Sequence, residues 1–511
     1  MRYGANLFSG LLNSVWTALV MFAVVPFYIN YLGIEAYGLI GFFITLQGVF
    51  LILDMGLSPT VSREIARAGA AKSLRKSANF LHSVAIFYWG VALFILLLFL
   101  LFSPLIANYW LDARQFDAQE VSKAVLLMGL VIACRFPHSI YRGALIGAER
   151  LVLVNGINIV MVTISSFGAV LVLVYLSSSI IAFFLWQALC GVALTFLMHR
   201  AAWKTIHADS QGGQTRPRPK FEKQALREVW RFTAGMTVVS LCGVVLLQLD
   251  KILISASLPL DDYGAYMVAV LVGSVFSAFF MPVFNVIYPR MTALVEARDT
   301  ATLIRLYRNG TRVLGLVLFP LAMVLGLYSE PFVALWTGDV GLAAKVAPLI
   351  LCLSVGFSIN GVMHFPYALQ LANGRTRIAL YNSVTLMIVM VPLTLFLVAK
   401  FGLVGGAASW MIVQIIYLFL GCWLTHRTLL RGTGVKWLLA DVGIPLTIAL
   451  IVGIFMKYLV SFSAADPYAA LALAGIAGLL AVVLIVLASP VFFPDIKRLV
   501  GLSDKSTEKA S

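Results

Sequence analysis

Three ionisable side chains lie within one long apolar run, where a membrane-spanning helix rarely carries charge. Arg135, His138 and Arg142 are spaced at i, i+3 and i+7, so a helix places them on one face, and Pro137 interrupts that helix between them. An arginine at the bilayer centre costs about 2.5–3.5 kcal/mol even on the lenient insertion scale. We therefore expect both arginines to face a water-filled cavity, where they would bind an anion. The alternative is a structural ion pair with a buried carboxylate such as Asp54.

Other candidates for binding or coupling are spread along the chain. Lys251 is the best counterpart of these arginines in the C-terminal half, but Asp250 precedes it directly, so an ion pair between the two is an equal alternative. Asp54 ends the second apolar run, where it would either pair with Arg142 or take up a proton. His138 is expected to assist the arginines or to pack rather than to relay protons.

A third set of polar residues suits sugar hydroxyls. Asn360, His364 and Tyr367 share a helix face at i, i+4 and i+7, and packing is the equal alternative. Asp441 is expected to be a charge at the N-terminus of a later helix. The five cysteines are scattered singly through apolar runs, at spacings that fit neither a metal site nor a redox motif, so we expect them to pack.

The composition is that of a multi-pass membrane protein. Of 511 residues, 61% are hydrophobic and 12% charged, whereas a soluble domain carries about 25% charged residues. A spanning helix needs about 20 apolar residues, and about fourteen runs meet that length. The first is too long for a signal peptide and is expected to stay uncleaved. The runs begin near residues 6, 36, 79, 121, 152, 180, 232, 264, 311, 345, 379, 404, 438 and 468.

Lysine and arginine are distributed unevenly between the loops. The loops after even-numbered runs hold most of them, including Arg63, Arg67 and the block from Arg290 to Arg312. Short loops rich in positive charge stay in the cytoplasm. We therefore expect these loops and both termini to be cytoplasmic.

The chain contains an internal repeat. Tyr37-Gly38 and Tyr263-Gly264 lie about 226 positions apart, in similar turns before apolar runs. This predicts two parallel six-helix lobes, related by a pseudo-two-fold axis along the membrane normal, plus two further helices. The predicted limits are 1–200 for the N-terminal lobe, 201–231 for a cytoplasmic linker with an amphipathic basic helix, 232–430 for the C-terminal lobe, 431–490 for helices thirteen and fourteen, and 491–511 for a cytoplasmic tail.

Nothing in the chain indicates catalysis or a cofactor. It has no glycine-rich phosphate loop with the required lysine, no metal-binding cluster and no nucleophile elbow. The outward loops are too short to build an enzyme domain. The positive charge sits in membrane loops, so we expect membrane lipids rather than nucleic acid as partners.

Several stretches resemble the polysaccharide-transporter branch of the multidrug/oligosaccharidyl-lipid/polysaccharide exporter superfamily. They are YLGIEAYG, LDMGLSPTVSREIA, GALIGAERLVLVN, LDKILISASLPLDDYGAY and FGLVGGAASW, which together span nearly the whole chain. The resemblance implies two lobes around a central cavity and alternating access. It also implies an undecaprenyl-pyrophosphate-linked oligosaccharide as substrate, flipped from the cytoplasmic to the periplasmic leaflet.

By this resemblance, Arg135, Arg142 and Lys251 would meet the pyrophosphate, in a monomer that works beside glycan-assembly proteins. A drug or organic-cation antiporter of the same superfamily is the alternative function, and it would need acidic residues in its cavity. The buried cations outnumber the buried acids, Asp54 and Asp250, by only one.

Overall fold

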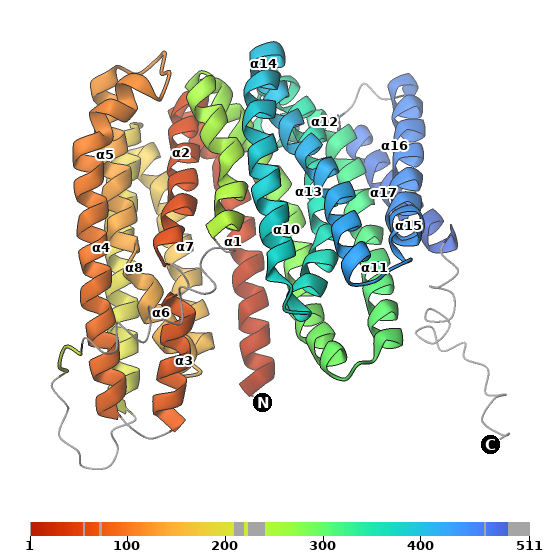
Figure 1. The fold of residues 1–511 in the computed structure, drawn as a ribbon. Coiled ribbons are helices and arrows are strands. Elements are labelled where there is room, and N and C mark those ends of the chain that lie inside the picture. The colour runs from red at the N-terminus through yellow and green to blue at the C-terminus, as the bar shows by residue number, and fades with distance from the viewer. Residues whose placement is uncertain are drawn as a thin grey trace. The chain divides into compact units, whose positions relative to one another are not determined.

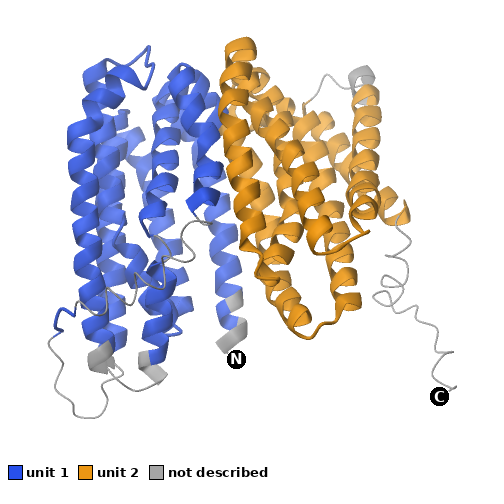
Figure 2. Cartoon of the chain, in the orientation of Figure 1, with its two compact units in different colours: residues 1–267 blue, residues 268–511 orange. Residues whose placement is uncertain are grey.

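The described residues form a bundle of helices, as the apolar runs predicted. The structure is a computed structural model that describes residues 2–54, 57–70, 74–208, 219–222, 241–463 and 467–488. Figure 1 shows the helices in chain order. The chain divides into two compact units, residues 1–267 and 268–511 (Figure 2). Within unit 1, α1 packs against α7, α4 against α5, and α8 against both α5 and α7.

The helices of unit 1 follow the first six predicted spans. They are α1 (Arg2–Leu32), α2 (Ile34–Phe50), the 3₁₀ turn η1 (Leu51–Asp54), α3 (Leu57–Ala70), α4 (Leu74–Tyr109), α5 (Ala118–Arg135), α6 (His138–Gly147), α7 (Leu151–Tyr175) and α8 (Ile180–Ala208). Residues 241–257 are also helical and belong to the seventh predicted span. The Asp117 side chain caps α5 by accepting a hydrogen bond from the Glu120 N–H at 2.8 Å.

Two spans of unit 1 are interrupted. The second ends as α2 and η1 and is followed by the separate helix α3, whereas the fourth consists of α5 and α6. The predicted interruption at Pro137 is confirmed, because α5 ends at Arg135 and α6 begins at His138. Proline lacks the backbone N–H that would continue the helical hydrogen bonds.

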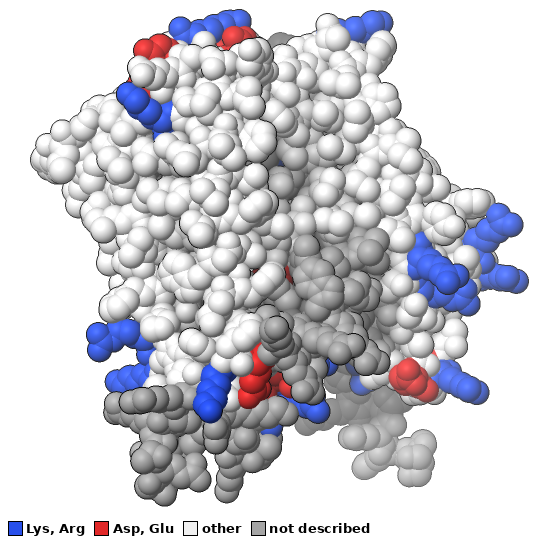
Figure 3. Space-filling view, turned by 60° about the vertical axis from the view of Figure 1, so that its left-hand side comes forward, with Lys and Arg blue, Asp and Glu red and all other residues white. Residues whose placement is uncertain are grey.

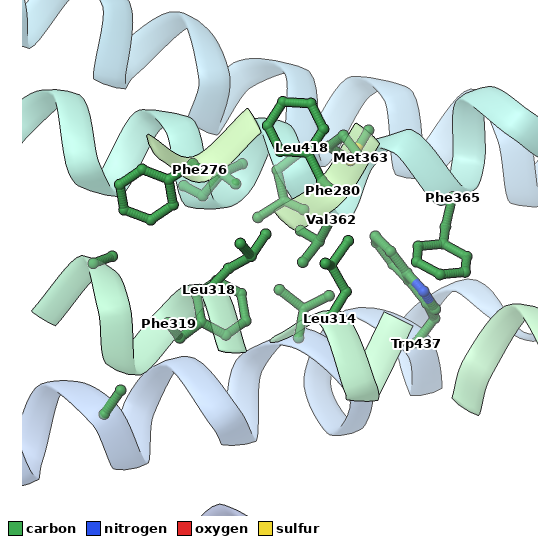
Figure 4. Close-up of a cluster of buried hydrophobic side chains, with 14 of the residues drawn as sticks. Phe276, Phe280, Leu314, Leu318, Phe319, Val362, Met363, Phe365, Leu418 and Trp437 are labelled. Carbon is green, nitrogen blue, oxygen red and sulfur yellow. The ribbon is translucent and has the colours of Figure 1, made fainter. Parts of the chain in front are cut away.

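Unit 2 begins within a helix that starts in unit 1. Its helices are α10 (Leu260–Glu296), α11 (Thr300–Leu327), α12 (Ser329–Thr337), α13 (Val340–Ala372), α14 (Thr376–Thr428), α15 (Gly434–Lys436), the π-helix η2 (Trp437–Gly443), α16 (Ile444–Ser463) and α17 (Pro467–Ala488). Helix α14 is two predicted spans joined at Gly402, whose φ of 56° breaks the helical path. Figure 4 shows part of the buried apolar core, to which α10, α11, α13, α14 and η2 contribute.

Twelve helical segments in the described ranges are long and apolar enough to cross a membrane. One of these is α14, which holds two of the predicted spans. Residues 241–257 are not among the twelve, but they form part of the seventh predicted span. Figure 3 shows a broad zone of uncharged side chains on the face drawn, with charged side chains gathered near the top edge and in the lower part. The all-helical membrane fold is therefore confirmed, while the predicted domain limits stay predictions.

The predicted linker is described only at its edges. Residues 201–208 continue α8, and most of the predicted amphipathic helix lies outside the described residues. Residues 220–222 are described, and they contact α4. The backbone N–H groups of Lys220 and Glu222 donate to Asn79 Oδ1 and Ser83 Oγ, each at 2.8 Å. This part of the linker is therefore fixed to unit 1.

Candidate functional site

Unit 1 contains a cavity of about 390 Å³. Residues of α1, α2, η1, α5, α6, α7 and α8 line it, and most of its wall is apolar. Its polar or charged lining includes Asp54, Arg135, His138, Asn158, Ser165 and Gln187. An apolar pocket with a few convergent polar groups is the usual form of a ligand site. The two interrupted spans both reach this cavity, so the breaks in the helices help to form it.

Arg135 brings a positive charge to the cavity. It is the last residue of α5, where the carbonyl end of the helix stabilises a cation. Its Nη2 donates to Gln187 Oε1 at 2.6 Å, and its guanidinium lies 6.0 Å from the centre of the Phe43 ring. Among the described residues, no acidic side chain forms an ion pair with Arg135. The cavity-facing alternative is therefore the one that the geometry favours for Arg135.

Two more candidates line the same cavity. His138 Nδ1 lies 2.5 Å from the carbonyl oxygen of Arg135, so this nitrogen must carry the proton and donate. Asp54 accepts hydrogen bonds from the Tyr88 hydroxyl and, at 3.3 Å, from Ser139 Oγ. The structure thus brings Arg135, His138 and Asp54 together around one space.

Arg142 is placed differently from its expected position. It is exposed on α6 and does not line the cavity. The prediction that all three residues face one cavity is wrong at Arg142: α5 ends at Arg135, and α6 begins at His138 beyond the interruption. The expected ion pair with Asp54 is not formed among the described residues, because Asp54 instead accepts hydrogen bonds from hydroxyl groups and from the backbone N–H of Ser58, although Arg142 acts on it electrostatically. A role for Arg142 in binding stays a prediction.

Lys251 forms an ion pair with Asp250, which was the alternative to a role in binding the substrate. Its Nζ lies 3.0 Å from Asp250 Oδ1 and donates to the Leu247 carbonyl at 2.7 Å. Asp250 also accepts a hydrogen bond from the Tyr266 hydroxyl at 2.6 Å, and its side chain is 2% exposed. The charge of Lys251 is therefore largely balanced within unit 1. Ser240, predicted on the same stripe, lies outside the described residues.

Asn360 and His364 belong to unit 2. Asn360 Nδ2 donates to Gln414 Oε1 at 3.2 Å, and His364 Nδ1 lies 2.9 Å from the Asn360 carbonyl oxygen. The His364 ring is 4.3 Å from the Phe280 ring and 5.6 Å from the Phe284 ring. Aromatic packing, the alternative to sugar binding, is what surrounds His364.

Sequence reasoning missed one charged cluster. Asp441, expected to be a helix N-terminal charge, is fully buried in η2 and forms ion pairs with Arg308 at 2.7 Å and Arg312 at 2.5 Å. The expectation is wrong because η2 packs against α11, which supplies both arginines. Their i, i+4 spacing was the available signal. No group of three or more histidine, cysteine or acidic side chains in the described ranges could hold a metal ion.

Comparison with known sequences identifies the family. Residues 3–295 match the family of polysaccharide biosynthesis proteins, and this match covers more than half of the chain. The chain belongs to this family. It is 23% identical over 432 residues to a protein of Shigella flexneri named "Putative O-antigen transporter", covering 81% of this chain and 97% of that protein.

Two solved structures show the same fold. The lipid II flippase MurJ, in an inward closed conformation, has a TM-score of 0.67 and 14% identity, covering 96% of this chain and 99% of MurJ. An inward-facing multidrug resistance MATE family transporter has a TM-score of 0.64 and 13% identity, covering 81% and 96%. The resemblance seen in the sequence motifs is confirmed. The protein is a multi-pass membrane protein of the polysaccharide biosynthesis family, with a fold that MurJ and MATE transporters share.

Proposed function

We propose that this protein is a flippase for an undecaprenyl-pyrophosphate-linked oligosaccharide. It moves the repeat unit of a surface polysaccharide from the cytoplasmic to the periplasmic leaflet of a bacterial inner membrane by alternating access. The family match and the name of the Shigella flexneri relative support polysaccharide as the cargo class. The fold shared with MurJ supports a lipid-borne cargo.

The observation that carries the proposal is the environment of Arg135. Its guanidinium lines an apolar cavity with a glutamine and an aromatic ring as neighbours. A pyrophosphate suits such a group, because a guanidinium binds phosphate oxygens through two parallel hydrogen bonds. These bonds are stronger in an apolar surrounding than in water. A guanidinium that forms no ion pair with a carboxylate in the described part of the chain is what an anionic head group requires.

The direction of transport agrees with the membrane potential. An inside-negative potential drives a negative charge outward, and the movement is favourable by about 2.3 kcal/mol per charge per 100 mV if the full field is crossed. Loops with excess positive charge would lie in the cytoplasm together with both termini. In this proposal the protein acts as a monomer among membrane lipids, without a cofactor, and hands its product to glycan-assembly proteins.

The organic-cation antiporter is the competing function. It would need a carboxylate in the cavity that can bind a cation. Asp54 lines the cavity, but the Tyr88 and Ser139 hydroxyls already bind its carboxylate. The geometry therefore favours an anionic cargo.

A gene deletion tests the proposal. We expect the deletion strain to lose its surface polysaccharide and to accumulate the undecaprenyl-pyrophosphate-linked repeat unit in its membrane lipids. A plasmid copy of the gene should reverse both effects. A deletion strain with normal polysaccharide and no accumulated lipid would refute the flippase. Increased sensitivity to cationic drugs in that same strain would support the antiporter.

A further inference from the structure

The two interruptions in unit 1 lie beside each other at the cavity. Leu51 and Asp54, in the turn that ends the second span, line it from one side. Phe136 and Ser139, at the junction of α5 and α6, line the same space. The cavity is therefore bounded by the two places where the long helices of unit 1 are discontinuous.

A polar trio connects these interruptions. The Asp54 carboxylate accepts a hydrogen bond from the hydroxyl of Tyr88 on α4. Ser139 Oγ, in the first turn of α6, lies 3.3 Å from Asp54 Oδ1 and 3.1 Å from the Phe136 carbonyl oxygen, so its single proton is shared between these two acceptors. The Tyr88 ring is fully buried and stacks on Phe136, with ring centres 5.0 Å apart. Asp54, Tyr88 and Ser139 thus join the end of α2, the middle of α4 and the start of α6.

The helices beyond the interruptions are paired closely. Gly143 and Gly147 of α6 lie against the backbone of α3, where an added Cβ would come within 2.6 Å of the Ser58 carbonyl oxygen and 2.3 Å of that of Ser62. Two small residues spaced by four allow such close helix contact in membranes. Ser58 Oγ also donates to the Ser139 carbonyl oxygen at 2.9 Å. We therefore treat α3 and α6 as one pair.

The internal repeat allows Asp54, Tyr88 and Ser139 to be compared with the equivalent residues of unit 2. The positions 226 residues further along are Phe280, Leu314 and Phe365, which line a residual cavity of only about 10 Å³ in unit 2 (Figure 4). There the corresponding helices, α10 and α13, run without interruption. In unit 1 these places are joined by hydrogen bonds in addition to apolar packing, whereas in unit 2 the equivalent residues have apolar side chains only.

We propose that Asp54, Tyr88 and Ser139 form a latch that holds the α3–α6 pair against the cavity. Release of the latch lets the pair move away and opens the cavity toward the cytoplasm. Hydrogen bonds between a carboxylate and hydroxyls can break and reform, whereas Phe280, Leu314 and Phe365 offer no such bonds. Asp54 is then a positioning residue for access. The cytoplasmic direction rests on the proposed function and its topology.

Thiol labelling tests the latch. Cys190 lines the cavity and is 4% exposed, so it serves as the reporter once Cys134, Cys242, Cys352 and Cys422 are replaced by serine. A membrane-impermeant maleimide is added to inverted inner-membrane vesicles. Tyr88→Phe removes only the hydroxyl, and Tyr88 does not line the cavity. We expect it to raise the labelling rate of Cys190 about tenfold, as the loss of a hydrogen bond to a charged group implies.

Tyr141→Phe is the matched control. Tyr141 is a buried tyrosine on α6 whose hydroxyl accepts only a long hydrogen bond, 3.4 Å, from Trp89. If the latch exists, the labelling rate of Cys190 in Tyr141→Phe should equal that in the parent protein. An equal rise in both variants would mean general loosening and would overturn the latch, as would unchanged labelling in Tyr88→Phe.

Ser139→Ala, which removes the other donor, gives the same test if Tyr88→Phe does not accumulate in the membrane. The labelling rate requires no glycan substrate. The latch can therefore fail while the flippase stands, and the deletion experiment can fail while the latch stands.

Discussion

The two halves of the chain carry the same polar arrangement, but among the described residues only the copy in unit 1 includes a cation and borders a cavity of about 390 Å³, whereas the cavity beside His364 measures about 10 Å³. In unit 1, Arg135 bonds Gln187 and His138 bonds the Arg135 carbonyl. In unit 2, Asn360 bonds Gln414 and His364 bonds the Asn360 carbonyl. The corresponding residues lie 225 to 227 positions apart in the sequence. The hydrogen bonds are therefore the same at the two equivalent places, whereas the guanidinium and the large cavity beside them are found at the place in unit 1.

Side-chain volume explains why the cavity beside the polar residues is large in unit 1 and small in unit 2. Asp54 leaves room for a cavity of about 390 Å³, whereas Phe280, 226 positions later, covers the His364 ring at 4.3 Å. The charges differ in a similar way. Arg308 and Arg312 of unit 2 are paired with Asp441, and among the described residues Arg135 has no acidic partner. Arg308 and Arg312 therefore stabilise the fold, whereas Arg135 is available to a ligand.

The largest effect should come from giving unit 1 the residue of unit 2. Arg135→Asn removes the cation from the cavity, and the loss of two charge-assisted hydrogen bonds to phosphate should lower export about 100-fold. Arg135→Lys should be milder, since it keeps the charge. Surface polysaccharide and accumulated lipid-linked glycan are measured in the complemented deletion strain. Arg200→Ala, an exposed arginine on α8, is the control. Normal export by Arg135→Asn would remove this residue from the mechanism.

The charged cluster of unit 2 should affect stability instead. Asp441→Asn leaves Arg308 and Arg312 without their counter-charge, and breaking such a buried pair costs about 3 kcal/mol of unfolding free energy. The measurement is the unfolding temperature of the purified protein in detergent, together with its abundance in the membrane. Glu330→Gln, which alters an exposed acid on α12, should leave both unchanged. A stable Asp441→Asn protein that fails to export would assign this cluster to transport.

The helical fold could be predicted from the sequence because its signals are local. The length of each apolar run sets a span, and the repeat of Tyr-Gly turns shows the duplication. The Pro137 interruption could be predicted too, since proline acts on its own helix. These features need no knowledge of which helices pack together.

The candidate site could be predicted only in part, because its parts depend on tertiary contacts. Arg135 and His138 were found from their helical spacing, but the same periodicity placed Arg142 wrongly once the helix was interrupted. Nothing near Asp441 in the sequence shows that Arg308 and Arg312, about 130 positions earlier, would surround it. The hydroxyl partners of Asp54 likewise come from other helices.

A smaller effect should distinguish the two glutamines. Gln187 orients the Arg135 guanidinium by accepting its hydrogen bond at 2.6 Å, so Gln187→Leu should lower export about tenfold, the worth of one hydrogen bond to a charged group. Gln414→Leu breaks only the neutral bond from Asn360 and should lower export less than twofold, an order-of-magnitude expectation for a residue outside this cavity. Both variants are compared in the export assay at equal membrane abundance. Equal losses would mean that the two halves contribute alike.

The smallest effect should come from removing a whole ion pair. Lys251→Met alone leaves the buried Asp250 carboxylate with the Tyr266 hydroxyl as its described partner, and it should lower the unfolding temperature. The double variant Asp250→Asn, Lys251→Met removes both charges, and replacing a buried pair together is often neutral. Its unfolding temperature and export should therefore lie closer to those of the parent than to those of the single variant. If the double variant regains stability but not export, the ammonium of Lys251 acts on the substrate, and a second cation joins Arg135 in the mechanism.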